Sequence, residues 1–260
     1  MQELFDSHSH LNDRRLRRDV DGVVLRAAEE GVSRIMCVGF DLPSSRLAVE
    51  IAGLHSGVWV AVGVHPHDAK TLNDGVLSEL ARLAREPKVV AIGEIGLDFY
   101  RDLSPRPVQE AAFRAQIELA KELEVPVIVH DRNAGPQVLR VIEDQGPPAA
   151  GGVLHCFSGS LDLARQAMEL GFYIGVAGPV TFQKSDALRA VVRAVPIERL
   201  LVETDAPYLT PEPFRGRKDN EPAFVRLVAE KVAEIKGIGL AEVARVTTAN
   251  ALRLFGGDSS

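Results

Sequence analysis

The sequence predicts an α/β protein, a (β/α)₈ TIM barrel with extra helices at its C-terminal end. Short runs rich in valine and isoleucine alternate with longer amphipathic stretches, which is typical of parallel strands connected by helices. Eight such runs can be counted, and the length of 260 residues suits one closed barrel. We therefore expect residues 1–260 to form a single domain. An open doubly wound sheet is the alternative, because periodicity alone does not show that the sheet closes.

The eight predicted strands are continuous apolar runs, as expected for parallel strands that are covered on both faces. They are Leu4–Phe5, Arg34–Val38, Trp59–Val62, Val89–Gly93, Val127–His130, Gly152–His155, Phe172–Gly175 and Leu200–Thr204. Helical patterns lie between them. One begins near Pro107 and carries Phe113 and Ile117 at helical spacing, and another follows Ser160 and stops before Gly171.

Two more helical patterns, Pro222–Lys236 and Leu240–Phe255, follow the eighth predicted strand. The stretch that leads to them, Pro207–Asn220, is rich in proline, arginine and lysine and predicts a loop. These two patterns are the predicted C-terminal helices.

The composition narrows the function classes. The net charge of −6 argues against a module that binds DNA mainly by neutralising phosphates. It does not argue against a nuclease whose bound metal ions supply the positive charge. The two cysteines form no CxxC pair, which excludes a disulfide scaffold and a thiolate zinc finger. With no apolar run near the length of a membrane span and no signal-peptide pattern, we expect a cytoplasmic protein without membrane or obligate protein partners.

Histidines gather at one structural position. Six of the seven lie at or just past the C-terminal end of a predicted strand, and only His55 falls on a predicted helix. The six are His8, His10, His65, His67, His130 and His155. In a barrel these strand ends converge on the face where active sites are built. The histidines therefore predict a site at that face.

The first and fourth strands end in groups that suit metal binding. His8 and His10 are two apart on an extended segment, so both imidazoles can reach one ion. The alternative for this pair is two exposed loop histidines. Glu94 directly follows its strand, and its two oxygens can bridge two cations, the alternative being an exposed loop glutamate. Asp98 either belongs to this site or only orders the loop in which it lies.

Strands five, six and eight add further ligand types. His130 and His155 each end an apolar run, and the alternative for each is a core histidine with satisfied hydrogen bonds. Asp205 can bind metal and accept a proton, while Glu203 can act as an outer partner. A buried salt bridge to an arginine is the competing explanation for these carboxylates. Mixed imidazole and carboxylate ligation suits zinc, manganese, iron or magnesium.

Together the motifs resemble the TatD family of metal-dependent deoxyribonucleases, within the wider amidohydrolase-like barrels. They occur in the family's order and span residues 6–222. They are Asp6-Ser7-His8-Ser9-His10-Leu11, Gly63-Val64-His65-Pro66, Gly93-Glu94-Ile95-Gly96-Leu97-Asp98, Val129-His130, His155-Cys156-Phe157-Ser158-Gly159, Glu203-Thr204-Asp205-Ala206-Pro207-Tyr208-Leu209 and Asn220-Glu221-Pro222.

The resemblance implies two divalent ions (Mg, Mn or Zn) and a DNA substrate, cut as a 3′–5′ exonuclease cuts a single strand. It implies that one ion is held by His8, His10 and Asp205, the other by His130 and His155, with Glu94 bridging them. Asp205 and Glu94 would then be the catalytic residues, Asp205 as the base. His65 would contact a substrate phosphate.

Basic residues in the loops after predicted strands suggest a phosphate-binding rim on this acidic chain. They are Arg101, Arg132, Arg215, Arg217 and Lys218, of which Arg132 and Arg215 are our main predictions. The alternative for each is a solvated surface arginine. The stretch 215–222 is one residue longer than the family pattern, and Ser9 replaces its usual cysteine with a side chain that should point away from the metals.

Two rival functions stay open from the residues alone. One is a metal hydrolase of a small ester or amide on the same barrel, although such barrels often bridge their metals with a modified lysine where Glu94 stands here. The other is a non-catalytic barrel, which the complete ligand set argues against. Nucleotide-dependent chemistry and serine hydrolysis have no motif in the chain.

Overall fold

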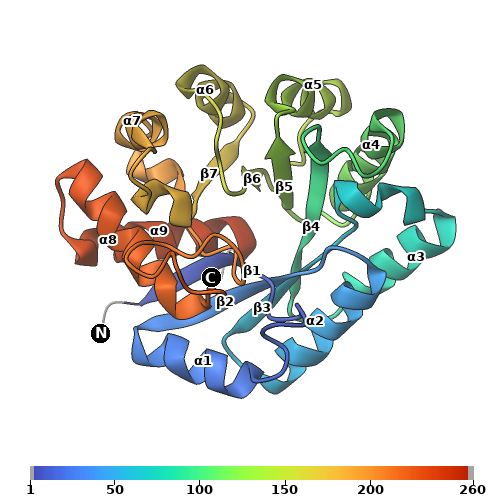
Figure 1. The fold of residues 1–260 in the computed structure, drawn as a ribbon. Coiled ribbons are helices and arrows are strands. Elements are labelled where there is room, and N and C mark those ends of the chain that lie inside the picture. Colours follow the sequence, from blue (N-terminus) through green and yellow to red (C-terminus); the bar gives the residue numbers. More distant parts are fainter. Residues whose placement is uncertain (1–2, 257–260) are drawn as a thin grey trace.

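The computed structural model of the protein describes residues 3–256. Eight parallel strands pair in sequence order, β1 to β8, and helices surround them (Figure 1). The strands are β1 (Leu4–Ser9), β2 (Val32–Val38), β3 (Val58–Val62), β4 (Val89–Asp98), β5 (Val127–Arg132), β6 (Gly152–Leu154), β7 (Phe172–Val176) and β8 (Leu200–Val202). The predicted barrel is confirmed, because this strand order and the approach of β8 to β1 exclude a doubly wound sheet.

Helices follow the strands around the barrel. They are α1 (Val20–Glu29), α2 (Leu42–Leu54), α3 (Asp74–Leu83), α4 (Arg106–Glu122), α5 (Gly135–Gln145), α6 (Leu161–Glu169), α7 (Asp186–Ala194), α8 (Val225–Lys236) and α9 (Leu240–Phe255), with short 3₁₀ turns η1 (Pro66–Thr71), η2 (Gly178–Thr181), η3 (Ile197–Arg199) and η4 (Pro222–Phe224). The predicted starts of α4 and α6 are confirmed, with Ser160 capping α6 through the Leu163 N–H. Within residues 3–256, every helix is too short or too polar to cross a membrane.

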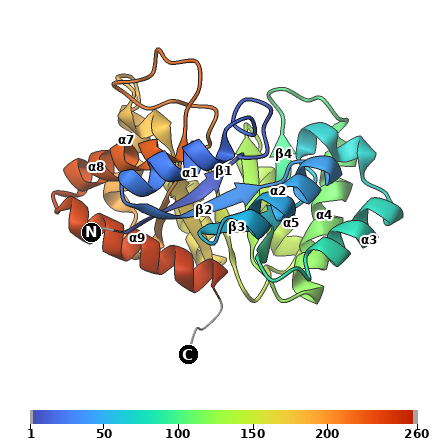
Figure 2. The same cartoon turned by 90° about the horizontal axis from the view of Figure 1, so that it is seen from below.

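The two C-terminal helices have different positions. In Figure 1, α8 lies in the outer ring between α7 and α1. By contrast, α9 lies on the side of the barrel opposite the loops that follow β1 and β8 (Figure 2). Its Leu254 and Phe255 join the inward-facing side chains Phe5, Met36 and Ile128 in one buried cluster. This helix therefore closes the end of the barrel away from the predicted site.

Strand β4 is longer than predicted, and two other strands are shorter. Its ladder with β5 shifts register and resumes at Gly96, so that Glu94 and Asp98 lie inside the strand. Strands β6 and β8 end at Leu154 and Val202, which leaves the polar residues that follow them outside the ladder. Residues such as His155 and Asp205, which follow these shorter strands, therefore lie at the barrel mouth outside the regular sheet.

The seam between β8 and β1 is held by individual contacts. Beyond the end of β8, Ala206 forms an isolated parallel bridge with Ser9, and the Asp205 N–H donates to the His8 carbonyl at 2.9 Å. Deeper in the seam, Thr204 donates from its backbone N–H and from Oγ1 to the Asp6 carboxylate, at 2.8 and 2.6 Å. Burial raises the pKa of Asp6 well above its usual range, against these hydrogen bonds.

Candidate metal centre

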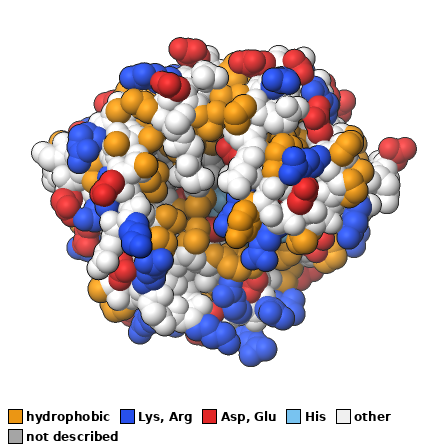
Figure 3. Space-filling view, turned by 45° about the horizontal axis from the view of Figure 1, so that its top comes forward, with side chains coloured by type: hydrophobic (Ala, Val, Ile, Leu, Met, Phe, Trp, Pro, Cys, Tyr) orange, Lys and Arg blue, Asp and Glu red, His pale blue; other side chains and the backbone are white. Residues whose placement is uncertain are grey.

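The six predicted ligands lie together at the C-terminal end of the barrel. In Figure 3, histidine side chains are visible at the bottom of a hollow in the middle of the surface. On one side of the cluster, the Nε2 atoms of His8 and His10 are 3.3 Å apart, and Glu94 Oε2 lies 3.5 and 3.6 Å from them. Asp205 Oδ1 lies 3.5 Å from His10 Nε2 and 3.9 Å from His8 Nε2.

The other oxygen of Glu94 faces a second set of nitrogens. Its Oε1 lies 2.8 Å from His130 Nδ1 and 2.8 Å from His155 Nε2, and these two nitrogens are 3.4 Å apart. One carboxylate therefore stands between two groups of imidazoles, as a bridging ligand would.

The backbone of β4 brings Glu94 to this place. Two residues on, Gly96 has a φ of +136°, and a Cβ there would lie 2.1 Å from the His130 carbonyl oxygen. Only glycine allows β4 and β5 to approach this closely. Asp205 also has a positive φ, +56°, which short polar side chains tolerate better than most.

The donor set fits divalent cations. Three overlapping groups each offer ligand atoms within 4.8 Å of one another: His8, His155 and Asp205; His8, His10 and Glu94; His65, Glu94 and His130. All of these side chains are buried or half-buried, and buried charges of this kind are expected to be paired or to coordinate metal. The described residues around the cluster thus have the chemistry of a mixed imidazole and carboxylate metal centre.

Outer partners orient the imidazoles. The His10 Nδ1–H donates to the Val38 carbonyl at 2.9 Å, which leaves Nε2 free for a metal. His130 faces the cluster through Nδ1, and its Nε2 lies 3.4 Å from Asp98 Oδ2. The same oxygen lies 2.7 Å from Nε2 of His67. Carboxylate–histidine–metal arrangements of this kind fix the tautomer and ring orientation of a ligand.

Glu203 takes the corresponding place behind His155. Its Oε1 lies 3.6 Å from His155 Nδ1 and accepts the Cys156 N–H, while Oε2 accepts the Ser7 hydroxyl at 3.3 Å. The carboxylate lies over Gly175, where a Cβ would come within 2.7 Å of Oε2. These contacts agree with the predicted outer role of Glu203, and no arginine pairs with it among the described residues.

Burial and neighbouring charges shift the pKa values of the cluster in different directions. Although burial opposes ionisation, the surrounding histidines hold the pKa of Glu94 well below its usual range and lower that of Asp205. Burial and the nearby His155 lower the pKa of His8. The pKa values of His10 and His155 are raised, because the carboxylates outweigh the effect of burial. A cation that binds there must compete with protons on these imidazoles.

His65 lies beside the cluster, and its hydrogen bonds define which ring nitrogen carries the proton. Its Nδ1 accepts the His67 N–H at 3.1 Å, so Nε2 carries the ring proton and points to Glu94 Oε1 at 3.5 Å. Burial lowers its pKa to about 4, so the ring is neutral at ordinary pH. Gln116 of α4 holds the adjacent Val64 by both backbone groups, at 2.7 and 3.0 Å. His65 is thus a fixed hydrogen-bond donor.

The predicted basic rim is only partly brought to the cluster. The Arg132 guanidinium lies 4.5 Å from the centre of the Tyr100 ring, and that of Arg215 lies 4.0 Å from the centre of the Phe182 ring. Neither forms a hydrogen bond or ion pair with the six ligands within the described chain. Arg101 contributes its backbone N–H to Asp98 Oδ1 at 2.7 Å, so Asp98 does order its loop as well as holding histidines.

Sequence reasoning gave no role to Gln109 or Asn220, although Asn220 lies in one of the family motifs. Gln109 of α4 bonds both backbone groups of Asp98, at 2.9 and 3.2 Å. Asn220 donates to the carbonyls of Thr204 and Tyr208, at 2.9 and 2.6 Å, and so ties the long loop to β8. The signal for Gln109 was a polar residue on the apolar face of a predicted helix. As predicted, the hydroxyl of Ser9 points elsewhere, to the Met36 carbonyl at 3.1 Å.

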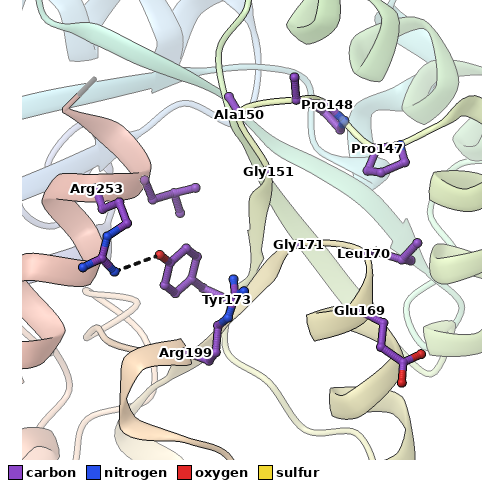
Figure 4. A pocket seen from close by; sticks show the side chains of 12 residues that line it. Pro147, Pro148, Ala150, Gly151, Glu169, Leu170, Gly171, Tyr173, Arg199 and Arg253 are labelled. Carbon is purple, nitrogen blue, oxygen red and sulfur yellow. Dashed lines mark hydrogen bonds between the residues drawn. The ribbon is translucent and has the colours of Figure 1, made fainter. Parts of the chain in front are cut away.

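A separate pocket of about 470 Å³ opens at the other end of the barrel (Figure 4). Tyr173 lies in it between Arg199 and Arg253, and Arg253 donates to its hydroxyl at 3.5 Å. None of the predicted ligands lines this pocket. It is therefore distinct from the metal centre.

The sequence matches a known family over almost its full length. A family model described as TatD related DNase matches residues 5–256. The uncharacterized metal-dependent hydrolase YabD of Bacillus subtilis (strain 168) is 45% identical over 252 residues, which cover 97% of this chain and 98% of that protein. The 3′-5′ ssDNA/RNA exonuclease TatD of Klebsiella pneumoniae (strain 342) is 41% identical over 259 residues, or 98% of each chain.

A solved structure agrees with these matches. The crystal structure of YJJV, a TatD homolog from Escherichia coli K12, superposes with a TM-score of 0.92 at 30% identity and covers 97% of this chain and 98% of that one. Organophosphorus hydrolases of Deinococcus radiodurans superpose with a TM-score of 0.66 at 16% identity, which shows a shared barrel fold only.

Proposed function

The chain belongs to the family of TatD-related DNases, and we propose that its metal centre hydrolyses phosphodiester bonds of DNA, as a 3′–5′ exonuclease acting on single strands. The position of Glu94 carries this proposal. Its two oxygens face two different groups of imidazole nitrogens, an arrangement suited to a pair of cations acting on one phosphate. The relative named as a 3′-5′ ssDNA/RNA exonuclease supports the choice of substrate and polarity.

Two divalent ions, of Mg, Mn or Zn, fit the donor set. His8, His10 and Asp205 would hold one and His130 and His155 the other, with Glu94 shared between them. Such ions supply positive charge that activates water and stabilises the charge developing on an attacked phosphate.

Asp205 is the proposed proton acceptor. Its Oδ1 faces His8 and His10, while its Oδ2 makes no hydrogen bond to any residue in the described range. The lowered pKa of Asp205 keeps the carboxylate ionised, the form that can accept a proton from an attacking water.

His65 and the basic loops are the proposed phosphate contacts. Because His65 carries its proton on Nε2, it can donate to a phosphate oxygen without being a metal ligand. Arg132 and Arg215 are proposed to hold the phosphates of the strand farther from the scissile bond, since Arg132 ends β5 and Arg215 lies in the loop after β8, both at the barrel mouth.

Degradation of an end-labelled single-stranded oligonucleotide tests the function. The protein is stripped with chelator and reloaded with magnesium, manganese or zinc, and Glu94→Ala serves as the inactive control. We expect metal-dependent shortening from the 3′ end that disappears in the variant. If no metal restores cleavage of any oligonucleotide although ions bind, the nuclease proposal is wrong, and small phosphoesters, esters and amides become the next substrates to assay.

Three expectations from the sequence stay predictions. They are a single domain over residues 1–260, of which 1–2 and 257–260 lie outside the described range, a cytoplasmic location, and the absence of an obligate protein partner. Cys37 and Cys156 are both free thiols, which suits a reducing compartment.

A further inference from the structure

Two exposed tyrosines lie next to residues of the metal centre or their supports. The ring of Tyr208 meets His10 edge-on, with 6.1 Å between ring centres. On the other side, the Tyr100 N–H donates at 2.9 Å to Asp98, the carboxylate whose other oxygen faces His130. Tyr208 is 46% exposed and Tyr100 is 61% exposed. Both side chains are exposed although Tyr208 lies beside the predicted ligand His10, and the backbone of Tyr100 bonds Asp98, which faces His130. Tyr208 is thus adjacent to the His10 group of ligands, and Tyr100 is adjacent to the support of His130.

An arginine covers one face of each ring. Arg15 Cζ lies 4.4 Å from the centre of the Tyr208 ring, and Arg132 Cζ lies 4.5 Å from that of Tyr100. Six arginines lie over aromatic rings in the described chain, and five of them, all except Arg199, are at the end of the barrel that holds the metal centre.

The Tyr208 ring is held in place before any ligand arrives. Its hydroxyl donates to Asp13 Oδ2 at 3.2 Å, and its carbonyl accepts from Asn220 at 2.6 Å. Arg15 is itself fixed by ion pairs with Asp13 and Asp219, each at 3.4 Å. Since the arginine is already paired, it supports the ring more than it attracts phosphate. A ring fixed in this way loses little entropy when a flat ligand stacks on it.

The Tyr100 side has a different charge balance. Arg132 makes no ion pair with any residue from 3 to 256, and its side chain is exposed. Here an unpaired positive charge lies over one face of an exposed aromatic ring. A base next to a phosphate is the ligand that such a pair suits.

We propose that Tyr208 and Tyr100 form two nucleotide-binding subsites, in which the bases on either side of the scissile phosphate stack on the open ring faces. This inference rests on the proposed exonuclease function. For 3′–5′ cleavage the two bases belong to the last two nucleotides. A single strand can turn its bases outward onto such rings, whereas the bases of a duplex are paired and stacked on each other. Stacking also tolerates any base, because each base has an aromatic face.

The test removes the bases and the rings in turn. The metal-loaded protein degrades a single-stranded oligonucleotide and two versions of the same strand, each with an abasic residue at one of the two 3′-terminal positions. Loss of one stacked base should lower kcat/KM by about 5- to 150-fold. Tyr208→Leu and Tyr100→Leu should show a similar loss on the intact strand and little further loss when the corresponding base is missing. Tyr100→Phe, which keeps the ring, should still discriminate against the abasic strands.

Leu103→Ala is the matched control, because Leu103 lies in the same loop as Tyr100, is 57% exposed and has no aromatic ring. Metal content and Tm report whether each variant remains folded and loaded. If the wild-type protein degrades intact and abasic strands equally fast, the subsites do not exist, while the exonuclease function stands. If it degrades none of these strands with any metal, the proposed function itself is wrong and the subsites fall with it.

Discussion

Asp98 and His130 face each other at 3.4 Å, between Oδ2 and Nε2, on the side of the imidazole that points away from the metal cluster. The other ring nitrogen, Nδ1, lies 2.8 Å from Glu94. The carboxylate of Asp98 therefore decides which nitrogen of His130 is free to act as a ligand. Its pKa is lowered well below the usual range, because His130 and the backbone N–H of Arg101 outweigh burial, so it stays charged.

Asp98→Asn should lower the affinity of the centre for metal by about 10- to 100-fold, as the loss of an outer carboxylate does in other sites. Metal titration of the chelator-stripped protein measures this affinity. Asp162→Asn, an exposed carboxylate of α6 that pairs only with Arg165, is the control. Equal metal affinity in the two variants would contradict the orienting role of Asp98.

Glu94→Gln should remove most bound metal and lower kcat by at least about 1000-fold, since several kcal/mol of charge stabilisation are lost. A single carboxylate faces both imidazole groups, so neither group should keep its ion at full occupancy. Elemental analysis of the dialysed protein measures the content, and Glu79→Gln on the surface of α3 is the control. Full occupancy together with near-normal turnover would rule out the bridging role.

Arg132→Gln should weaken binding of single strands and also reduce its salt dependence. Each phosphate contact contributes about 0.7 to the slope of log affinity against log salt for single strands, and the slope should decrease by that amount. The measurement is KM at several salt concentrations. Arg245→Gln, an exposed arginine paired with Glu242 on α9, should leave the slope unchanged. An unaltered slope in Arg132→Gln would show that Arg132 is an ordinary surface residue.

Asp6 should make the metal-free protein less stable as pH rises. Burial raises its pKa in the folded state above the value of 3.8 expected in the unfolded chain. Between these two values the folded protein binds more protons, so the free energy of unfolding falls as pH increases through that window. Asp6→Asn lacks this titration and should show a smaller fall in urea unfolding at a series of pH values. Identical pH dependence in both proteins would contradict the raised pKa.

Phe255→Ala should lower the free energy of unfolding by about 3–5 kcal/mol, the usual cost of removing a buried aromatic ring. The ring packs in the barrel interior with its centre 6.2 Å from that of Phe5. Urea unfolding measures the change, and Leu54→Ala, which removes a side chain that is 82% exposed, should cost less than about 0.5 kcal/mol. Because α9 closes the far end of the barrel, metal content should be unaffected; its loss would mean that the two ends are coupled.

Much of the site could be predicted from the sequence because its residues occupy a repeated structural position. A parallel strand is a local pattern of apolar residues, and the C-terminal ends of all such strands meet at one face. That reasoning placed His130 and His155, which are far apart in the chain, at the same mouth. It placed Glu94 and Asp98 just beyond a strand, whereas they lie within β4, because the register shift of β4 against β5 has no local sequence signal.

The sequence by itself determined the alternation of strands and helices, their order and the residue types that follow the strands, since periodicity and strand ends are local properties of the chain. Closure of the sheet into a barrel depends on contacts between β1 and the segment after β8, which lie near opposite ends of the chain. Only the tertiary structure decided which atoms face the metal cluster and which side chains remain exposed beside it. His130 turns Nδ1 toward the cluster because Asp98 takes Nε2, and Tyr208 becomes an exposed platform because Arg15 and Asp13 reach it from the other end of the chain. Such assignments depend on hydrogen bonds between segments that are distant in sequence, and no local pattern encodes them.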